Sequence, residues 1–212
     1  MHSDLDISGC TALGDKGLIA LLKGLSSVSE SADSAVRLWA VLTLAFCDLG
    51  DEGLQAALAA AEKIQLQYLW MGSNRIELRA DLTPSICSIN SIHLRCLSLS
   101  GNPRLLSASV ILLFDTLSAP NLHSLNLAGC EIGTEAGAAI GGYLCSKRSR
   151  SLQSLHLGHN TFTLDDIRRI IDAVERGCFT LLQMGHHSNP PLVLHPTALY
   201  GEDPVVDARI QV

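Results

Sequence analysis

The sequence predicts an α/β solenoid, in which a short unit of strand, tight turn and helix repeats along the chain. The most regular copy covers residues 122–144 and reads LHSLNLAGCEIGTEAGAAIGGYL. Its first half places Leu122, Leu125 and Leu127 in fixed phase before Cys130, and its second half carries apolar residues at helical spacing. Because one such unit cannot bury its apolar side alone, it must stack on copies of itself.

Further copies support this prediction, because the same anchors return in the same order. An Asn or Cys closes each strand-like segment, at Cys10, Cys47, Asn74, Asn102, Cys130, Asn160 and Asn189. Successive spacings are 37, 27, 28, 28, 30 and 29 residues, so the period is near 28 apart from the first. The anchors before these positions include Leu66/Leu69/Met71, Leu94/Leu97/Leu99 and Leu152/Leu155/Leu157, with a weaker fit at Leu181/Met184/His186. We expect the Asn or Cys to turn inward and bond backbone groups that would otherwise be buried and unpaired.

Helices are expected after the turns, at residues 15–25, 51–64, 107–118, 134–145 and 164–176, with only a short helix near Pro84 in the third copy. Asp15 and Asp51 follow a turn Gly and are expected to cap the helices that they begin. Gly24 would end the first helix. The Ser-rich insertion at residues 26–34 is expected to be a surface loop that accounts for the long first spacing.

The repeat pattern predicts one domain over residues 1–190 and a non-repeat tail over residues 191–212. Val205, Val206 and Ile210 favour an extended segment in that tail, which would cap the last turn of the stack. At the other end the chain starts inside a repeat. Either the first strand is therefore a short protected edge, or the chain is one segment of a longer protein.

The composition narrows the class of protein. Apolar residues make up 47% of the chain and aromatic residues only 4%, so the core is expected to be aliphatic. The formal net charge of −6 argues against a nucleic-acid partner. No long apolar run or signal sequence occurs, so no membrane partner is expected and the predicted location is cytoplasmic or nuclear. There is no C-x-x-C pair, and Cys10, Cys47 and Cys130 are expected to be buried, reduced thiols.

The sequence resembles the ribonuclease-inhibitor class of leucine-rich repeats in three features. These are the 28-residue period, the L-x-x-L-x-L-x-x-[NC]-x-[LI] core and the Gly-Asp-x-Gly turns at residues 14–17 and 50–53. That class includes ribonuclease inhibitor, Ran GTPase-activating proteins and the sensor regions of NOD-like receptors. The resemblance implies a horseshoe of about seven repeats, with a parallel sheet on the concave face and helices on the convex face. It does not specify a function, because its members include inhibitors, GTPase activators and scaffolds.

In such a fold the residues between the strand anchors face the concave side, and two neighbouring aromatic residues stand out there. Tyr68 and Trp70 belong to one strand, with Val41 and Phe46 alongside. Aromatic side chains are the usual anchors of protein interfaces, so these residues are the candidate protein-binding site. The alternative is that a loop, such as residues 75–93 or the insertion at residues 26–34, folds over the aromatic side chains and buries them.

Asn126 and His156 continue the same row across the face and complete the candidate set. Further histidines at His123, His159 and His187 are not joined by a carboxylate or Cys at a ligand spacing, so no metal is expected. No nucleophile elbow or phosphate-binding loop occurs, so no catalytic residue and no cofactor is assigned. The sequence predicts a non-enzymatic module that binds a protein partner on the concave face, as a scaffold or regulator. The alternative is a GTPase-activating protein of the Ran type, which would act by shaping its partner's own catalytic site.

Overall fold

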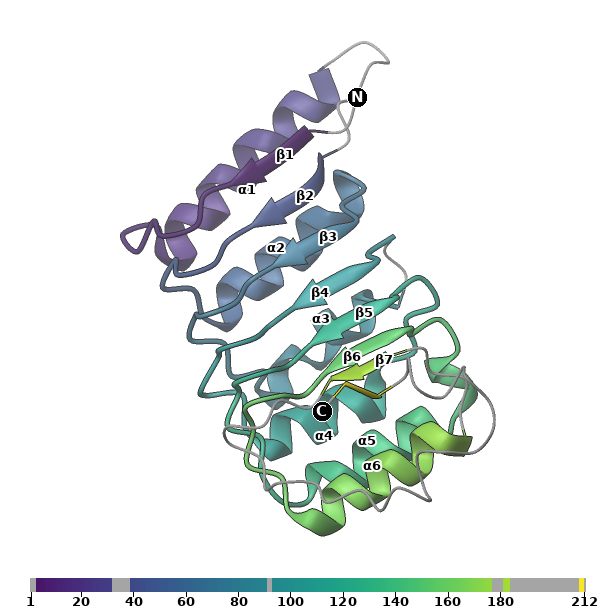
Figure 1. Ribbon diagram of the computed structural model, residues 1–212. Helices are drawn as coiled ribbons and strands as arrows, with labels where there is room; N and C mark the ends of the chain where they lie inside the picture. Colours follow the sequence, from purple (N-terminus) through teal and green to yellow (C-terminus); the bar gives the residue numbers. More distant parts are fainter. Residues whose placement is uncertain (1–2, 32–38, 91–92, 177–180, 184–209, 212) are drawn as a thin grey trace.

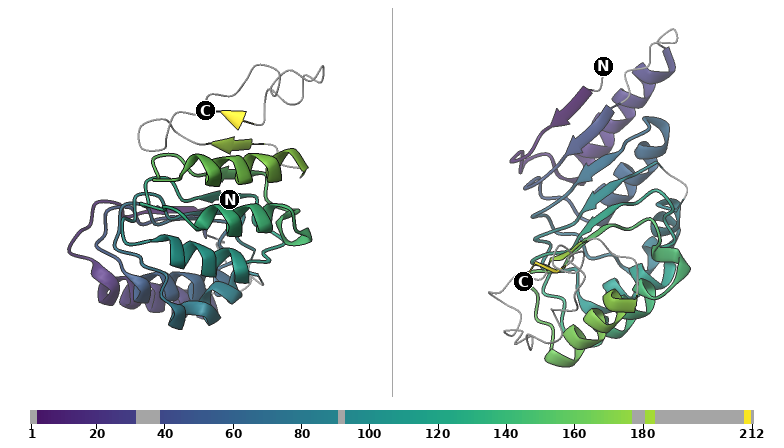
Figure 2. Two further views of the ribbon diagram at one scale, coloured as in Figure 1. Left: turned by 90° about the horizontal axis from the view of Figure 1, so that it is seen from below. Right: turned by 45° about the vertical axis from the view of Figure 1, so that its right-hand side comes forward.

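A computed structural model describes residues 3–31, 39–90, 93–176, 181–183 and 210–211 of the chain. Strands and helices alternate along these residues, and the strands form one parallel sheet with the helices on one side of it (Figures 1 and 2). The predicted α/β solenoid with a parallel sheet is confirmed. The horseshoe curvature and the number of seven repeats stay predictions.

The described residues form an eight-stranded sheet in which each strand pairs with its neighbours in sequence. One leucine in each of β2 to β6 is the register partner of the leucine in the next strand, and these leucines are at most 2% exposed. Because every strand keeps the same phase, each presents one side to the helices and the other away from them. The strands are β1 (Ser3–Asp6), β2 (Trp39–Thr43), β3 (Tyr68–Trp70), β4 (Cys96–Ser98), β5 (Ser124–Asn126), β6 (Ser154–His156), β7 (Leu181–Gln183) and β8 (Ile210–Gln211).

The helices agree with the predicted ranges to within two residues, apart from the first. They are α1 (Gly14–Ser31), α2 (Asp51–Lys63), α3 (Thr83–Ser88), α4 (Ser107–Thr116), α5 (Ala136–Leu144) and α6 (Leu164–Arg176), with 3₁₀ turns η1 (Ala80–Leu82) and η2 (Lys147–Ser149). The short α3 has Pro84 in its first turn, as expected from the irregular third copy.

Helix α1 is longer than predicted, since it continues through Gly24 and through residues 26–31 of the expected surface loop. A Gly inside a helix costs about 1 kcal/mol relative to Ala. Leu22 before the glycine is buried and Leu25 after it packs against the core, so burial on both sides of the glycine offsets this cost. The Ser26 hydroxyl donates to the Leu22 carbonyl at 2.9 Å and is therefore satisfied within the helix.

The Asn residues at the strand ends turn inward, as predicted, and bond the turn of the preceding repeat. Asn74 accepts the N–H groups of Cys47 and Leu49 at 2.9 and 3.1 Å and donates to the Leu44 carbonyl at 2.8 Å. Asn160 repeats the pattern against residues 127–132. These side chains satisfy backbone groups that no strand or helix pairs, and so they join one repeat to the next.

The cysteines at the same position behave differently from the Asn residues. Cys47 and Cys130 are buried, and the Cys130 thiol donates to the Leu99 carbonyl at 3.2 Å. Cys10 is exposed, and the prediction that it is buried is wrong. The reason is its place in the stack, because β1 is the outer strand of the sheet and no described turn lies beyond it.

Two aspartates that were expected to cap their own helices bond to the next repeat instead. Asp15 in α1 accepts the N–H groups of Gly50 and Gly53 at 2.8 and 3.0 Å, at the start of α2. Asp51, the first residue of α2, accepts three N–H groups from residues 77–79 at 2.8, 3.0 and 3.1 Å. Successive helices begin side by side, so a carboxylate in the first turn reaches unpaired N–H groups of the neighbouring repeat.

The pairing of β7 differs from the predicted register by two residues. Leu182, and not Met184, is the register partner of Leu155, and Gln183 pairs with His156. Strand β8 pairs in parallel with β7, within the stretch where the sequence favours an extended segment. The predicted repeat position at Asn189 lies outside the described residues, and the domain boundary at residue 190 stays a prediction.

Candidate functional site

One side of the sheet carries no helix in the described part of the chain (Figure 1). In β1 to β6 the residues on either side of the helix-facing leucine point to this side, because side chains alternate along a strand. We call this surface the open face. Its members by strand position are Asp4, Asp6, Val41, Thr43, Tyr68, Trp70, Cys96, Ser98, Ser124, Asn126, Ser154 and His156, of which Ser98 is buried.

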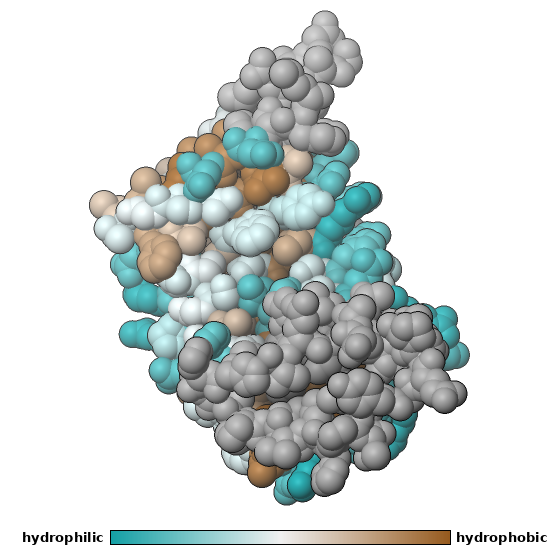
Figure 3. Space-filling model, in the orientation of Figure 1, coloured by the Kyte–Doolittle hydropathy of each residue, from teal (hydrophilic) through white to brown (hydrophobic). Residues whose placement is uncertain are grey.

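The two aromatic residues predicted to bind a partner lie together on the open face. Trp70 is 44% exposed and Tyr68 is half-buried, both on β3. Val41 is the register partner of Tyr68, and Thr43 is the register partner of Trp70, so β2 and β3 share one continuous surface. Figure 3 shows apolar side chains gathered over the N-terminal strands of this side. Residues 75–90 do not bury Trp70, so the alternative of a covering loop is wrong for that side chain.

Phe46 lies at the edge of the open face, in the loop that follows β2. Its ring is 60% exposed, and its N–H donates to the carbonyl of Gly72, two residues beyond Trp70, at 3.2 Å. Its φ of +56° is in the left-handed region, which is rare for a bulky side chain. Three equivalent turn positions are glycines with positive φ: Gly9, Gly101 and Gly129. The left-handed backbone at Phe46 was not predicted from the sequence. The glycines at the same position in three other copies indicate it.

A shallow cavity of about 320 Å³ lies beside Phe46, where the loops after β1, β2 and β3 meet. Thr11, Ser73 and Asn74 contribute to its lining together with Asp48 and Arg75. Arg75 forms an ion pair with the Asp48 carboxylate and donates to the Asp48 carbonyl at 2.8 Å. The only guanidinium in this lining is therefore already paired, which leaves the ring of Phe46 as the main apolar contact.

Asn126 and His156 are register partners on β5 and β6 but are not close to the aromatic pair. With about 4.8 Å between strands, they lie about 10 and 14 Å from the row position of Trp70. Asn126 Oδ1 accepts the N–H of Ala128 at 3.0 Å, and His156 Nε2 lies 2.8 Å from the Ser154 hydroxyl. A partner that contacts both the aromatic pair and His156 must therefore span four strands, from β3 to β6.

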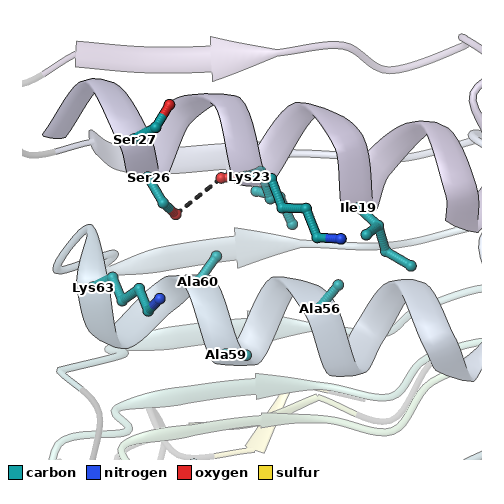
Figure 4. A pocket seen from close by; sticks show the side chains of 9 residues that line it. Ile19, Lys23, Ser26, Ser27, Ala56, Ala59, Ala60 and Lys63 are labelled. Atoms are coloured by element: carbon teal, nitrogen blue, oxygen red, sulfur yellow. Dashed lines mark hydrogen bonds between the residues drawn. The ribbon is translucent and has the colours of Figure 1, made fainter. Parts of the chain in front are cut away.

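Two depressions on the helix side are weaker candidates. A groove of about 360 Å³ between α1 and α2 is floored by alanines and edged by Lys23 and Lys63 (Figure 4). A similar groove of about 350 Å³ lies between α5 and α6, where Gly141 and Gly142 replace larger side chains. Their recurrence indicates that small residues between adjacent helices produce them, so neither groove is specific to one function.

Among the described residues, no group of three or more His, Cys, Asp or Glu could hold a metal ion. His187, one of the histidines considered from the sequence, lies outside the described residues. None of the described helices is both long enough and apolar enough to cross a bilayer.

Stacked units of strand, turn and helix, with an inward Asn or Cys after each strand, define an α/β repeat protein. A family described as Leucine Rich repeat matches residues 3–22, 41–56, 118–141 and 148–168. Each matched segment spans strand residues and the beginning of the helix that follows. The chain is a leucine-rich repeat protein, and domains of this family generally mediate protein–protein interactions. A comparison with curated proteins found no match.

Proposed function

We propose that this chain is a non-enzymatic protein-binding module that contacts its partner through the open face. Trp70, Tyr68, Val41 and Phe46 serve as the apolar anchors of that contact. Asn126 and His156 provide polar contacts farther along the sheet. The ribonuclease-inhibitor class of repeats, with its concave binding surface, is the subclass that the repeat length favours.

The distribution of aromatic side chains carries this proposal. The structure describes the burial of six aromatic side chains. Phe114, Tyr143 and Phe162 are at most 1% exposed. The other three, which are those of the proposed site, gather on β3 and the loop after β2 and stay partly or largely exposed. A fold with so few aromatic residues gains core packing by burying them, so a cluster left outside favours a binding surface.

The exposed part of Trp70 alone is enough to matter for affinity. A Trp side chain offers up to about 250 Å² of surface, so 44% exposure leaves roughly 110 Å² in water. Burial of that area by a partner is worth about 2–3 kcal/mol at 25 cal/mol per Å². This is the magnitude of an interface hot spot.

Interaction capture with matched variants tests the proposal. Proteins bound by the wild-type chain are identified, and their affinities are measured by calorimetry for the wild type, Trp70→Ala and Leu164→Ala. Leu164 is the control because it is also an exposed large apolar residue, at 45%, but lies in α6. We expect Trp70→Ala to weaken binding by about 30-fold without lowering the melting temperature, and Leu164→Ala to leave the affinity unchanged. Equal affinity of the wild type and Trp70→Ala for every captured protein would contradict the proposal.

The alternative of a GTPase activator of the Ran type stays a prediction of the resemblance. The rate of GTP hydrolysis by Ran, measured with and without this protein, tests it.

A further inference from the structure

The charged residues of the open face are two aspartates, and both lie on β1 at one end of the sheet. Asp4 and Asp6 are exposed on β1. Asp4 is in register with Val41, and through it with Tyr68, while Asp6 is in register with Thr43 and, through it, with Trp70. Each carboxylate therefore lies two strand spacings, about 10 Å, from an aromatic residue in the same row.

Within the described part of this surface, no Lys or Arg neutralises the two carboxylates. Among the described residues of the open face there is no Lys or Arg. Arg75, in the neighbouring loop, is paired with Asp48, and Lys23 and Lys63 lie on the helix side (Figure 4). The Ser8 hydroxyl and the Ser8 N–H, which is 2.9 Å from Asp6 Oδ1, bond to the Asp6 carboxyl and lower its pKa. The negative charge of this residue is thus maintained at neutral pH.

The aromatic cluster and the two carboxylates require different side chains in a partner. Burial of the aromatic cluster brings the partner's surface within reach of β1, and a neutral or acidic surface there would remove water from the carboxylates without replacing its hydrogen bonds. A Lys or Arg side chain would replace them with charge-assisted bonds. Such a side chain can also contact the face of the Trp70 ring favourably.

We infer that the partner of the open face presents a cationic segment, with a Lys or Arg over Asp4 and Asp6 and an apolar or aromatic side chain on Trp70. This inference rests on the proposed function and names the chemistry of the partner. In an extended segment that crosses the strands, the 10 Å separation corresponds to about three residues between the basic and the apolar side chain. In a helix it corresponds to about seven residues.

A selection from a phage-displayed library of random 12-residue peptides tests this inference without a known partner. Peptides are selected on the wild-type chain, and each is then measured on Trp70→Ala, on the double variant Asp4→Asn/Asp6→Asn and on a control. The control is Asp172→Asn/Glu175→Gln, which removes the same charge from exposed positions of α6. Circular dichroism and melting temperature verify that each variant is folded.

We expect the peptides that require Trp70 to be enriched in Lys and Arg relative to the unselected library. Their affinity is expected to fall about tenfold on Asp4→Asn/Asp6→Asn and to change less than twofold on the control. It should also fall as the salt concentration rises from 50 to 300 mM. Peptides that require Trp70 but show no excess of basic residues, or no response to the aspartate variants, would overturn the inference and leave the proposed function standing. A selection that yields no peptide dependent on Trp70 would contradict both.

Discussion

At the scale of single residues, Phe46 departs from what folding alone requires. A left-handed backbone costs a residue with a Cβ about 1–2 kcal/mol, and Phe46 adopts it with φ of +56°. Its ring gains little from burial, because it is 60% exposed. Glycine would remove both disadvantages, so the fold itself gives no reason for an aromatic side chain here. Contact with a partner gives one.

Phe46→Gly is therefore expected to stabilise the fold while it weakens partner binding. Relief of the backbone strain should exceed the extra chain entropy of glycine in the unfolded state, for a gain of about 0.5–1 kcal/mol in the free energy of unfolding. Urea denaturation measures this gain. Ser73→Gly is the matched control, because Ser73 has the equivalent turn position in the next repeat with φ of +53°. It should stabilise without a comparable loss of affinity. Destabilisation by Phe46→Gly would show that the ring supports the fold.

At the scale of elements, the link between α2 and the following loop depends on one carboxylate. Asp51 is 8% exposed and accepts three successive N–H groups from residues 77–79. Leu78, in the middle of this loop, has φ of +53° and is 2% exposed. A backbone that curls in this way lets successive N–H groups converge on one anion. The carboxylate thus stabilises a loop conformation that would otherwise be strained.

Asp51→Ala is expected to lower the free energy of unfolding by about 2–4 kcal/mol, because it leaves three N–H groups without their acceptor. Asp51→Asn keeps one acceptor oxygen and should lose about half as much. The control is Asp81→Ala. The Arg79 side chain forms ion pairs with both Asp51 and Asp81, at 3.4 and 3.6 Å, but the side chain of Asp81 is 69% exposed. That change should stay within about 0.5 kcal/mol. Denaturant unfolding compares the three variants, and similar losses for Asp51→Ala and Asp81→Ala would refute the role assigned to Asp51.

Sequence periodicity predicted the strands and most helix bounds, because each anchor and each helix depends on residues close together in the chain. It could not predict that Asp15 and Asp51 serve the next repeat, since that depends on which turn lies alongside. The register of β7 was also predicted wrongly, because it depends on how β7 pairs with the neighbouring strand. Its predicted anchors included Met184 and His186, a weak pattern, and pairing with β6 places Leu182 in register with Leu155 instead.

The candidate site was predictable in part. Alternation along a strand was enough to place Tyr68 and Trp70 on the open face, because Leu69 between them has to be buried. The backbone conformation of Phe46 was not predictable from its own identity, since a Phe normally avoids positive φ. Only comparison with the glycines at equivalent turns indicates it.

At the scale of the whole molecule, stacking places ionisable groups inside a continuous core in their neutral forms. Cys130 is fully buried and Tyr143 is 1% exposed. Burial raises the pKa of the Cys130 thiol to about 11 and that of the Tyr143 hydroxyl to about 12. Both groups hold their protons more tightly when folded than when unfolded. Stability from this source is complete below the unfolded pKa of each group and is lost as the pH rises through the folded value.

The free energy of unfolding is therefore expected to fall as the pH rises from about 9 toward 12. Between pH 8 and 10.5, Cys130 alone should account for about 2 kcal/mol of that fall. Cys130→Asn removes this contribution and retains a side chain that can bond neighbouring backbone, as Asn102 and Asn160 do. Urea unfolding at the two pH values should give a smaller difference for Cys130→Asn than for the wild type, while Cys145→Ala, which removes an exposed thiol, should match the wild type. An equal pH difference in all three proteins would mean that the Cys130 thiol ionises in the folded stack as readily as in the unfolded chain, contrary to its position in the core.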